Sequence, residues 1–82
     1  MTTQSEESSN FKEQEDLYYY LTIMSLLEGT PVYELEMELE MQEHLENYEG
    51  CSGILKAIKE AEYKTYRDLK LIAIELDRKY KF

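Results

Sequence analysis

The stretch from Tyr33 to Met41 constrains the fold more than any other part of this chain. It alternates strictly between an apolar side chain and a glutamate. Alternation with a period of two is the pattern of a half-buried strand. The residues themselves are Glu, Leu and Met, which favour helices and are mostly poor strand formers. We therefore predict a helix from Val32 to Glu49, with a strand at residues 32–41 as the alternative.

As a helix, this segment carries two apolar stripes. The first stripe consists of Tyr33, Met37, Met41, Leu45 and Tyr48. The second stripe consists of Val32, Leu35 and Leu39. A helix with two apolar stripes suits a position between its own core and a second subunit. His44 falls beside the first stripe, and we expect it to be a partly buried structural histidine.

Helices are indicated on both sides of the Gly29-Thr30-Pro31 turn, and the second of them is the helix that continues from Val32. The first runs from about Phe11 to Glu28, because apolar residues recur there at three- and four-residue spacing. Asn10 and Glu13 have the spacing of a capping box at its start, and Gly29 is the expected C-terminal stop. In the second helix, Thr30 is the expected cap and Pro31 the first helical residue.

The C-terminal third predicts one or two more helices. Two glycines and a serine indicate a loop over Glu49–Gly53, followed by a helix from Ile54 to about Ala61. Thr65 and Asp68 resemble a capping box that begins another helix at Tyr66, reaching about Tyr80, although the two helices could also be continuous. The last helix is apolar nearly all round, which predicts that it is the central, most buried one.

These elements predict an all-α protein, a compact bundle of three to four helices; the α+β alternative has a strand at 32–41. The chain of 82 residues is long enough for one domain, which we place at 10–82, after a disordered polar tail at 1–9. We expect a homodimer, because the last helix and the two-stripe segment offer more apolar surface than a domain of this size covers easily.

Charge is placed very unevenly along the chain. The net charge is −9, yet residues 1–55 hold 13 acids and one base, and residues 56–82 hold five acids and eight bases. No Lys or Arg occurs between Glu13 and Leu55. Phosphates would be repelled by this long acidic part. We therefore expect no direct binding to nucleic acid or to an anionic membrane. The charge favours a basic protein partner, or it serves solubility alone.

The sequence motifs of common catalytic and metal sites are missing. His44 is the sole histidine and Cys51 the sole cysteine, and no metal-binding or phosphate-binding motif surrounds them. We expect no enzyme activity, no cofactor and no metal site. One cysteine forms no internal disulfide, no apolar run approaches membrane-spanning length, and the N-terminus lacks the pattern of a signal peptide. A cytoplasmic location follows by elimination.

Seven acids within sixteen residues form the candidate binding site. They are Glu34, Glu36, Glu38, Glu40, Glu43, Glu46 and Glu49. Like charges at helical spacing cost roughly 0.2–0.5 kcal/mol a pair. A small domain has little stability to spare, so this cost suggests that the acids have a function. On a helix, acids four residues apart are separated by about 6 Å along the axis, similar to phosphates along a nucleic-acid strand. Such a row could occupy the basic groove of a DNA-binding protein.

In size, acidity and tyrosine content, the chain resembles the small host-takeover proteins of large lytic bacteriophages. The segment Glu34-Leu35-Glu36-Met37-Glu38-Leu39-Glu40, with the acids after it, resembles more narrowly the DNA mimics that inhibit bacterial histone-like HU proteins. The resemblance implies an inhibitor acting in the host bacterial cytoplasm on a nucleoid-associated protein. The alternative is an adaptor that binds a host enzyme such as RNA polymerase, through Tyr18–Tyr20 or through the second stripe.

Overall fold

Four helices make up the computed structural model, which describes the backbone of residues 3–81 and the side chains of residues 10–81. They are α1 (Thr3–Leu27), α2 (Val32–His44), α3 (Tyr48–Ala61) and α4 (Tyr66–Tyr80). The predicted all-α bundle is confirmed. The strand alternative at 32–41 is wrong, because helix propensity outweighs the period-two pattern there. Of the predicted tail at 1–9, residues 1 and 2 lie outside the described residues, and the backbone of residues 3–9 belongs to α1.

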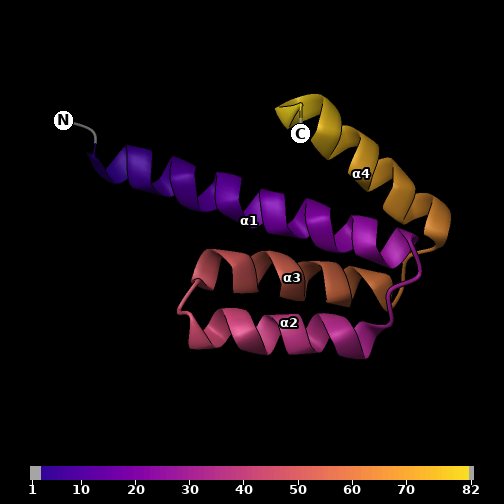
Figure 1. Cartoon of the computed structure of the whole chain (residues 1–82). Helices are drawn as coiled ribbons and strands as arrows, with labels where there is room; N and C mark the ends of the chain where they lie inside the picture. The colour runs from indigo at the N-terminus through magenta and orange to yellow at the C-terminus, as the bar shows by residue number, and fades with distance from the viewer. Residues whose placement is uncertain (1–2, 82) are drawn as a thin grey trace.

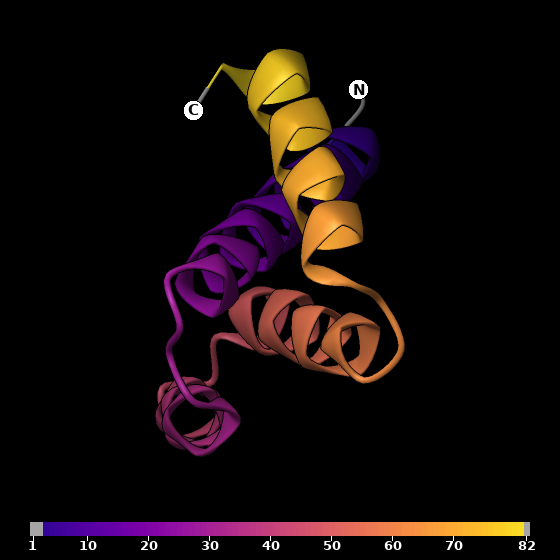
Figure 2. The same cartoon turned by 90° about the vertical axis from the view of Figure 1, so that its right-hand side faces the viewer.

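The helices pack in the spatial order α4, α1, α3, α2 (Figure 1). The turned view in Figure 2 also places α2 and α4 at opposite sides of the molecule. Two clusters of buried side chains join the helices. One cluster connects α1, α3 and α4 through Tyr19, Ile23, Ala57, Leu69 and Ala73. The other connects α2 to α3 through Leu35, Ile54 and Ile58.

Helix α4 is peripheral, so the prediction that it is central is wrong. Its buried residues are Leu69 and Ala73, whereas Leu71 is 55% exposed and Ile74 is 44% exposed. The hydroxyl of Tyr80 donates a hydrogen bond of 2.6 Å to Asp16 and so ties the end of α4 back to α1. The central element is α1, which lies between α3 and α4 (Figure 1).

The predicted loop at Glu49–Gly53 is wrong, because these residues form the first turns of α3. Gly53 faces α1 so closely that an added Cβ would lie 2.3 Å from the backbone oxygen of Glu15 and 2.7 Å from the backbone nitrogen of Tyr19. The glycine thus serves close helix packing and not a turn. Beside it, Ser52 donates a hydrogen bond to the Glu15 carboxylate.

The ends of α1 and α2 share one hydrogen-bonding pattern. Gly29 has φ +96°, its N–H bonds to the oxygen of Leu26, and the next N–H bonds to the oxygen of Ser25, which is a Schellman motif. The predicted stop at Gly29 is confirmed. The same motif ends α2 at His44, well before the expected Glu49, and there Glu46 takes the left-handed position with φ 59°.

Helix starts were predicted with mixed success. Thr65 and Asp68 form the expected capping box, each side chain bonding the backbone N–H of the other at 3.2 Å. Asn10 caps nothing, because it lies inside α1. Pro31 stands one position earlier than expected, as the N-cap residue of α2, so Thr30 lies outside the helix.

Candidate functional site

The candidate acids lie on α2 and on the corner that follows it. Five of them, Glu34, Glu36, Glu38, Glu40 and Glu43, are exposed on α2. Glu46 is exposed in the turn after α2, and Glu49 is half-buried in the first turn of α3. The structure therefore brings the first five together on one helix and places the last two at its end.

The five acids of α2 form two rows. Successive helical residues are rotated by about 100°, so Glu34 and Glu38 share one flank, whereas Glu36, Glu40 and Glu43 share the other. The core-facing side between the rows carries Leu35, Leu39 and Gln42, of which the first and last are buried. A single continuous row is thus replaced by two rows, about one helix diameter apart, or about 10–12 Å.

The first apolar stripe of the segment lies between the two rows on the side away from the core. Tyr33 is 62% exposed, Met37 63% and Met41 57%. Leu45 and Tyr48 continue these three residues past the end of α2 and are equally exposed. We call the five residues the outer strip. Two shallow hollows flank it, one reaching Glu34 and Glu38 and the other reaching Glu40 and His44.

No basic side chain of residues 10–81 forms an ion pair with these carboxylates. Among residues 10–81, the ion pairs are those of Lys12 with Glu15 and Asp16, on α1, and of Lys64 with Glu60, after α3. On α2, Glu38 accepts a hydrogen bond of 2.8 Å from the buried amide of Gln42. The α2 surface therefore presents concentrated negative charge around an apolar centre.

A polar network fixes the corner between α2 and α3. Asn47 donates from its side chain to Gln42 at 2.9 Å and accepts from the backbone N–H of Gly50 at 3.3 Å, which caps α3. The N–H of Asn47 also bonds to the backbone oxygen of Gln42. This network, together with burial of Leu35 and Ile54, holds the α2 surface in a defined orientation.

His44 and Cys51 are the two remaining candidates for chemistry, and His44 differs from expectation. His44 lies beside Met37 and Met41 as predicted, but it is exposed, so its predicted partial burial is wrong. Cys51 lies half-buried in α3, and its thiol is 3.9 Å from the backbone oxygen of Leu39. Burial, reinforced by the nearby Glu43 charge, raises the pKa of Cys51. In the part of the chain that the structure describes, no cluster of three or more His, Cys, Asp or Glu is arranged to hold a metal ion.

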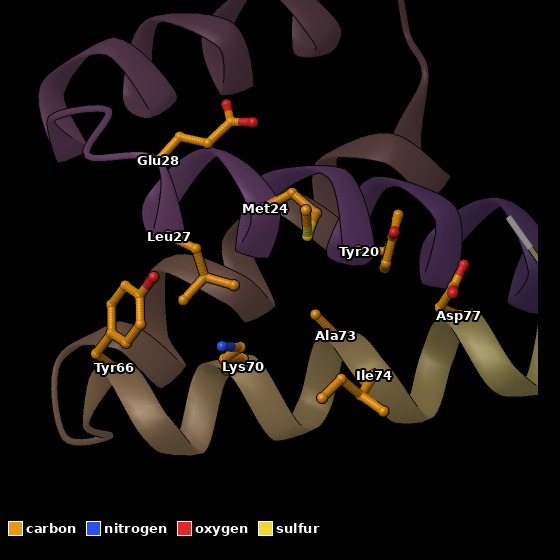
Figure 3. Close-up of a pocket in the computed structure, with 9 residues that line it drawn as sticks. All are labelled: Tyr20, Met24, Leu27, Glu28, Tyr66, Lys70, Ala73, Ile74 and Asp77. Carbon is orange, nitrogen blue, oxygen red and sulfur yellow. The ribbon is translucent and has the colours of Figure 1, made fainter.

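A separate hollow of about 360 Å³ lies between α1 and α4. Figure 3 shows Tyr20, Met24 and Leu27 on α1 facing Ala73 on α4, with Ile74 at the edge of the hollow. Charged side chains stand only at its margins, with Lys70 and Asp77 on α4 and Glu28 pointing away from α4 in this view. This apolar hollow resembles incomplete packing of the outer helix more than a site with convergent polar groups.

Five of the acids named from the sequence lie together on α2, but most of the apolar residues named for the adaptor alternative are not on the surface. Leu35 is buried, Leu39 is half-buried and Tyr19 is buried, so these residues form core. The exposed apolar surface is the outer strip. Periodicity identifies this strip but does not tell whether it faces the core or the solvent. No described helix is both long enough and apolar enough to cross a membrane.

Comparison of the chain with models of known protein families, with curated protein sequences and with solved structures gives no match.

Proposed function

We propose that this chain is a protein-binding inhibitor, without enzymatic activity, that occupies the DNA-binding groove of a basic nucleic-acid-binding protein. The observation that carries the proposal is the pair of acidic rows on α2, which no basic side chain of residues 10–81 neutralises. A histone-like nucleoid protein is the partner class that fits best. The protein would act in the cytoplasm, that of the bacterial host if a phage encodes it.

The spacing of the rows supports this proposal. Within each row, acids recur about 4.5–6 Å apart along the axis, and the rows lie about 10–12 Å from one another. The major groove of DNA is about 12 Å wide and the minor groove about 6 Å, and proteins that bend DNA can widen a groove. The spacing of the two rows thus matches a major groove or a widened minor groove. Carboxylates on the two flanks of α2 can therefore meet basic side chains that normally straddle a groove.

The outer strip supports the choice of partner. Architectural DNA-binding proteins combine basic side chains with apolar wedges that insert between bases. Met37 and Met41, both more than half exposed, offer such wedges an apolar surface between the carboxylates. Methionine is flexible and adapts to irregular partner surfaces, so a rigid match is not required.

Charge placement supports fast and salt-sensitive association. A surface of one sign steers an oppositely charged partner and raises the association rate, and salt screens this effect. Four of the eight bases in residues 56–82 lie on α4, at the opposite side of the molecule from α2 (Figure 1), and none of the other four forms an ion pair with an acid of α2. These bases therefore do not cancel the field of α2.

The test is competition between this protein and a labelled DNA duplex for a purified HU-type protein, across a salt series. The variant E36Q/E40Q/E43Q removes one row. The matched control E13Q/E28Q/E62Q changes three exposed acids outside α2 and leaves the same net charge. Exposed ion pairs contribute about 0.2–1 kcal/mol each, so the α2 variant should bind about 3- to 100-fold more weakly, whereas the control should stay close to wild type. Equal weakening by both variants, or affinity that ignores salt, contradicts the proposal.

The second candidate is an adaptor that binds a non-basic enzyme through the outer strip. The exposure of Tyr33, Met37 and Met41 favours it. Its signature is binding that persists in high salt and is lost in M37D while E36Q/E40Q/E43Q retains it. L35D is unsuitable for this test, because Leu35 is buried between α2 and α3.

A further inference from the structure

The outer face of α4 has the opposite character to the outer strip of α2. Leu71 and Ile74 are exposed there at 55% and 44%, although Leu69 and Ala73 of the same helix are buried. Arg67 and Arg78 share this face at helical spacing. The flanking bases, Lys70 and Lys81, are also exposed, and a hollow lined by Ile74, Asp77, Arg78 and Lys81 marks its C-terminal end. The result is an apolar patch accompanied by positive charge.

The acids of α4 offset this charge only in part. Asp68 lies in the capping box at the start of the helix, and Asp77 lines both the hollow between α1 and α4 (Figure 3) and the hollow beside Arg78 and Lys81. Glu75 lies at the margin of the face, beside Leu71 on the helical projection. No ion pair within residues 10–81 involves Arg67 or Arg78. Both guanidinium groups are thus available to a carboxylate from outside the chain.

We propose that the outer strip of α2 is covered by the outer face of α4 from a second copy of this chain. The apolar centres would then meet, with Met37 and Met41 against Leu71 and Ile74. The acidic rows of α2 would flank the basic residues of α4. Helices of 13 and 15 residues have similar lengths, about 20 and 22 Å at 1.5 Å per residue.

The arrangement of the fold makes this contact intermolecular and head-to-tail. Helices α2 and α4 lie at opposite sides of one molecule (Figures 1 and 2), so one chain cannot pair its own two surfaces. Each contact uses the α2 of one copy and the α4 of the next, which leaves one free surface of each kind. Such heterologous contacts extend into rings or chains of subunits.

Charge disfavours the symmetric alternatives. Pairing α2 with α2 would place glutamate rows against each other without a compensating base, and pairing α4 with α4 would bring Arg67 and Arg78 close to their own copies. Like charges placed together oppose association. The α2-to-α4 contact alone joins opposite charges at both apolar patches.

Self-association of this kind follows from the surfaces of α2 and α4 and does not require the proposed inhibitory function. It adds a regulation to that function, because the second copy covers the surface that a basic partner would use. Association at high protein concentration would hide the acidic rows, and dilution or a competing basic partner would expose them.

The test is sedimentation velocity of the full chain from micromolar to millimolar concentration, with M37D, L71D and the control L55D, which changes an exposed leucine of α3. Circular dichroism verifies that each variant is folded. Wild type and L55D should associate, and more weakly in high salt. M37D and L71D should each raise the dissociation constant at least tenfold. Mixing the two should give a one-to-one complex and nothing larger, because M37D retains α4 and L71D retains α2.

Each other outcome overturns the proposal. Association of L71D alone would indicate α2-to-α2 pairing, association of M37D alone would indicate α4-to-α4 pairing, and a wild type that stays monomeric would exclude self-association. The DNA competition assay separates this result from the inhibitory function. L71D has an intact α2, so it should compete for the HU-type protein at least as well as wild type. If L71D fails to compete in that assay while wild type still self-associates, the inhibitory function is contradicted and the self-association proposal is not.

Discussion

Replacing Gly53 by alanine tests whether α1 and α3 are as close as the structure places them. The new Cβ would lie 2.3 Å from the backbone oxygen of Glu15 and 2.7 Å from the backbone nitrogen of Tyr19. Both neighbours are backbone atoms, so no side-chain rotation relieves the contact. Ordinary contact begins at 3.4 Å, and α1 and α3 would therefore have to separate by about 1 Å at this point, the deficit against that contact distance.

The magnitude follows from two opposing effects. Overpacking a well-packed interior typically costs about 1–3 kcal/mol, and this contact falls at the upper end because the interface of α1 and α3 also positions Ile23, Ala57 and Ile54. Alanine is a better helix former than glycine by about 1 kcal/mol. We expect a net loss of about 1–2 kcal/mol in the free energy of unfolding. For a domain of this size, that loss lowers Tm by about 4–16 °C.

Urea denaturation followed by far-ultraviolet circular dichroism measures this loss. The matched control is Gly50→Ala, the same change one turn earlier in α3, where the Cβ would meet the side chain of Asn47 at 2.7 Å. Moving the Asn47 side chain would weaken its bonds to Gln42 and Gly50, at a cost of about 1 kcal/mol, which the helix propensity of alanine offsets. No backbone has to move, so the control should lose less stability than Gly53→Ala. If Gly53→Ala proves as stable as wild type or more stable, the close approach of α1 to α3 is refuted.

Three further predictions concern single groups. Glu46→Gly should stabilise the protein by about 0.5–1 kcal/mol in urea unfolding. Glu46 has φ 59°, and this left-handed conformation costs an L-residue about 1–2 kcal/mol, whereas glycine avoids that cost but loses more backbone entropy on folding. An unchanged unfolding midpoint would contradict this. The hydrogen bond to Asp16 raises the pKa of Tyr80 from 10.0 to about 12, and burial raises that of Tyr19 to about 12. The folded state therefore favours the neutral phenols, so their contribution to stability should be complete below pH 10 and fall as the pH rises from 10 to 12; Tyr80→Phe should flatten that fall in unfolding measured across this range. Cys51, with its raised pKa, should be alkylated by iodoacetamide more slowly than a free thiol at pH 8, and the rate should match the free thiol if the side chain is in fact open to solvent.

Local signals in the sequence predicted the helices and several of their ends. The capping box of Thr65 and Asp68 was predicted from their three-residue spacing, and the stop at Gly29 from the freedom of glycine to adopt positive φ. Neither prediction depended on the tertiary fold. Glu46 could not be identified in the same way. It occupies a position that glycine prefers, and it does so because the corner network of Asn47 and Gln42 fixes the turn.

The errors arose where a residue type serves two purposes. Gly53 looks like a loop residue in the sequence, and only the position of α1 against α3 reveals that it serves close helix packing. Likewise, the two apolar stripes of α2 are equivalent in the pattern of the chain. Which stripe faces the core depends on where α3 lies, and this made Leu35 a core residue and left Met37 exposed.

The serial order α4, α1, α3, α2 has a consequence for how the protein opens. Each outer helix is anchored mainly to a single neighbour, so either can detach while the other three keep their main contacts, whereas removing α1 or α3 breaks two contacts at once. Partial opening at the edges should therefore be far more frequent than complete unfolding. In native-state hydrogen exchange, the backbone amides of α2 and α4 should exchange before those in the central parts of α1 and α3. The two surfaces that we assign to recognition are thus carried by the two helices that come away most readily.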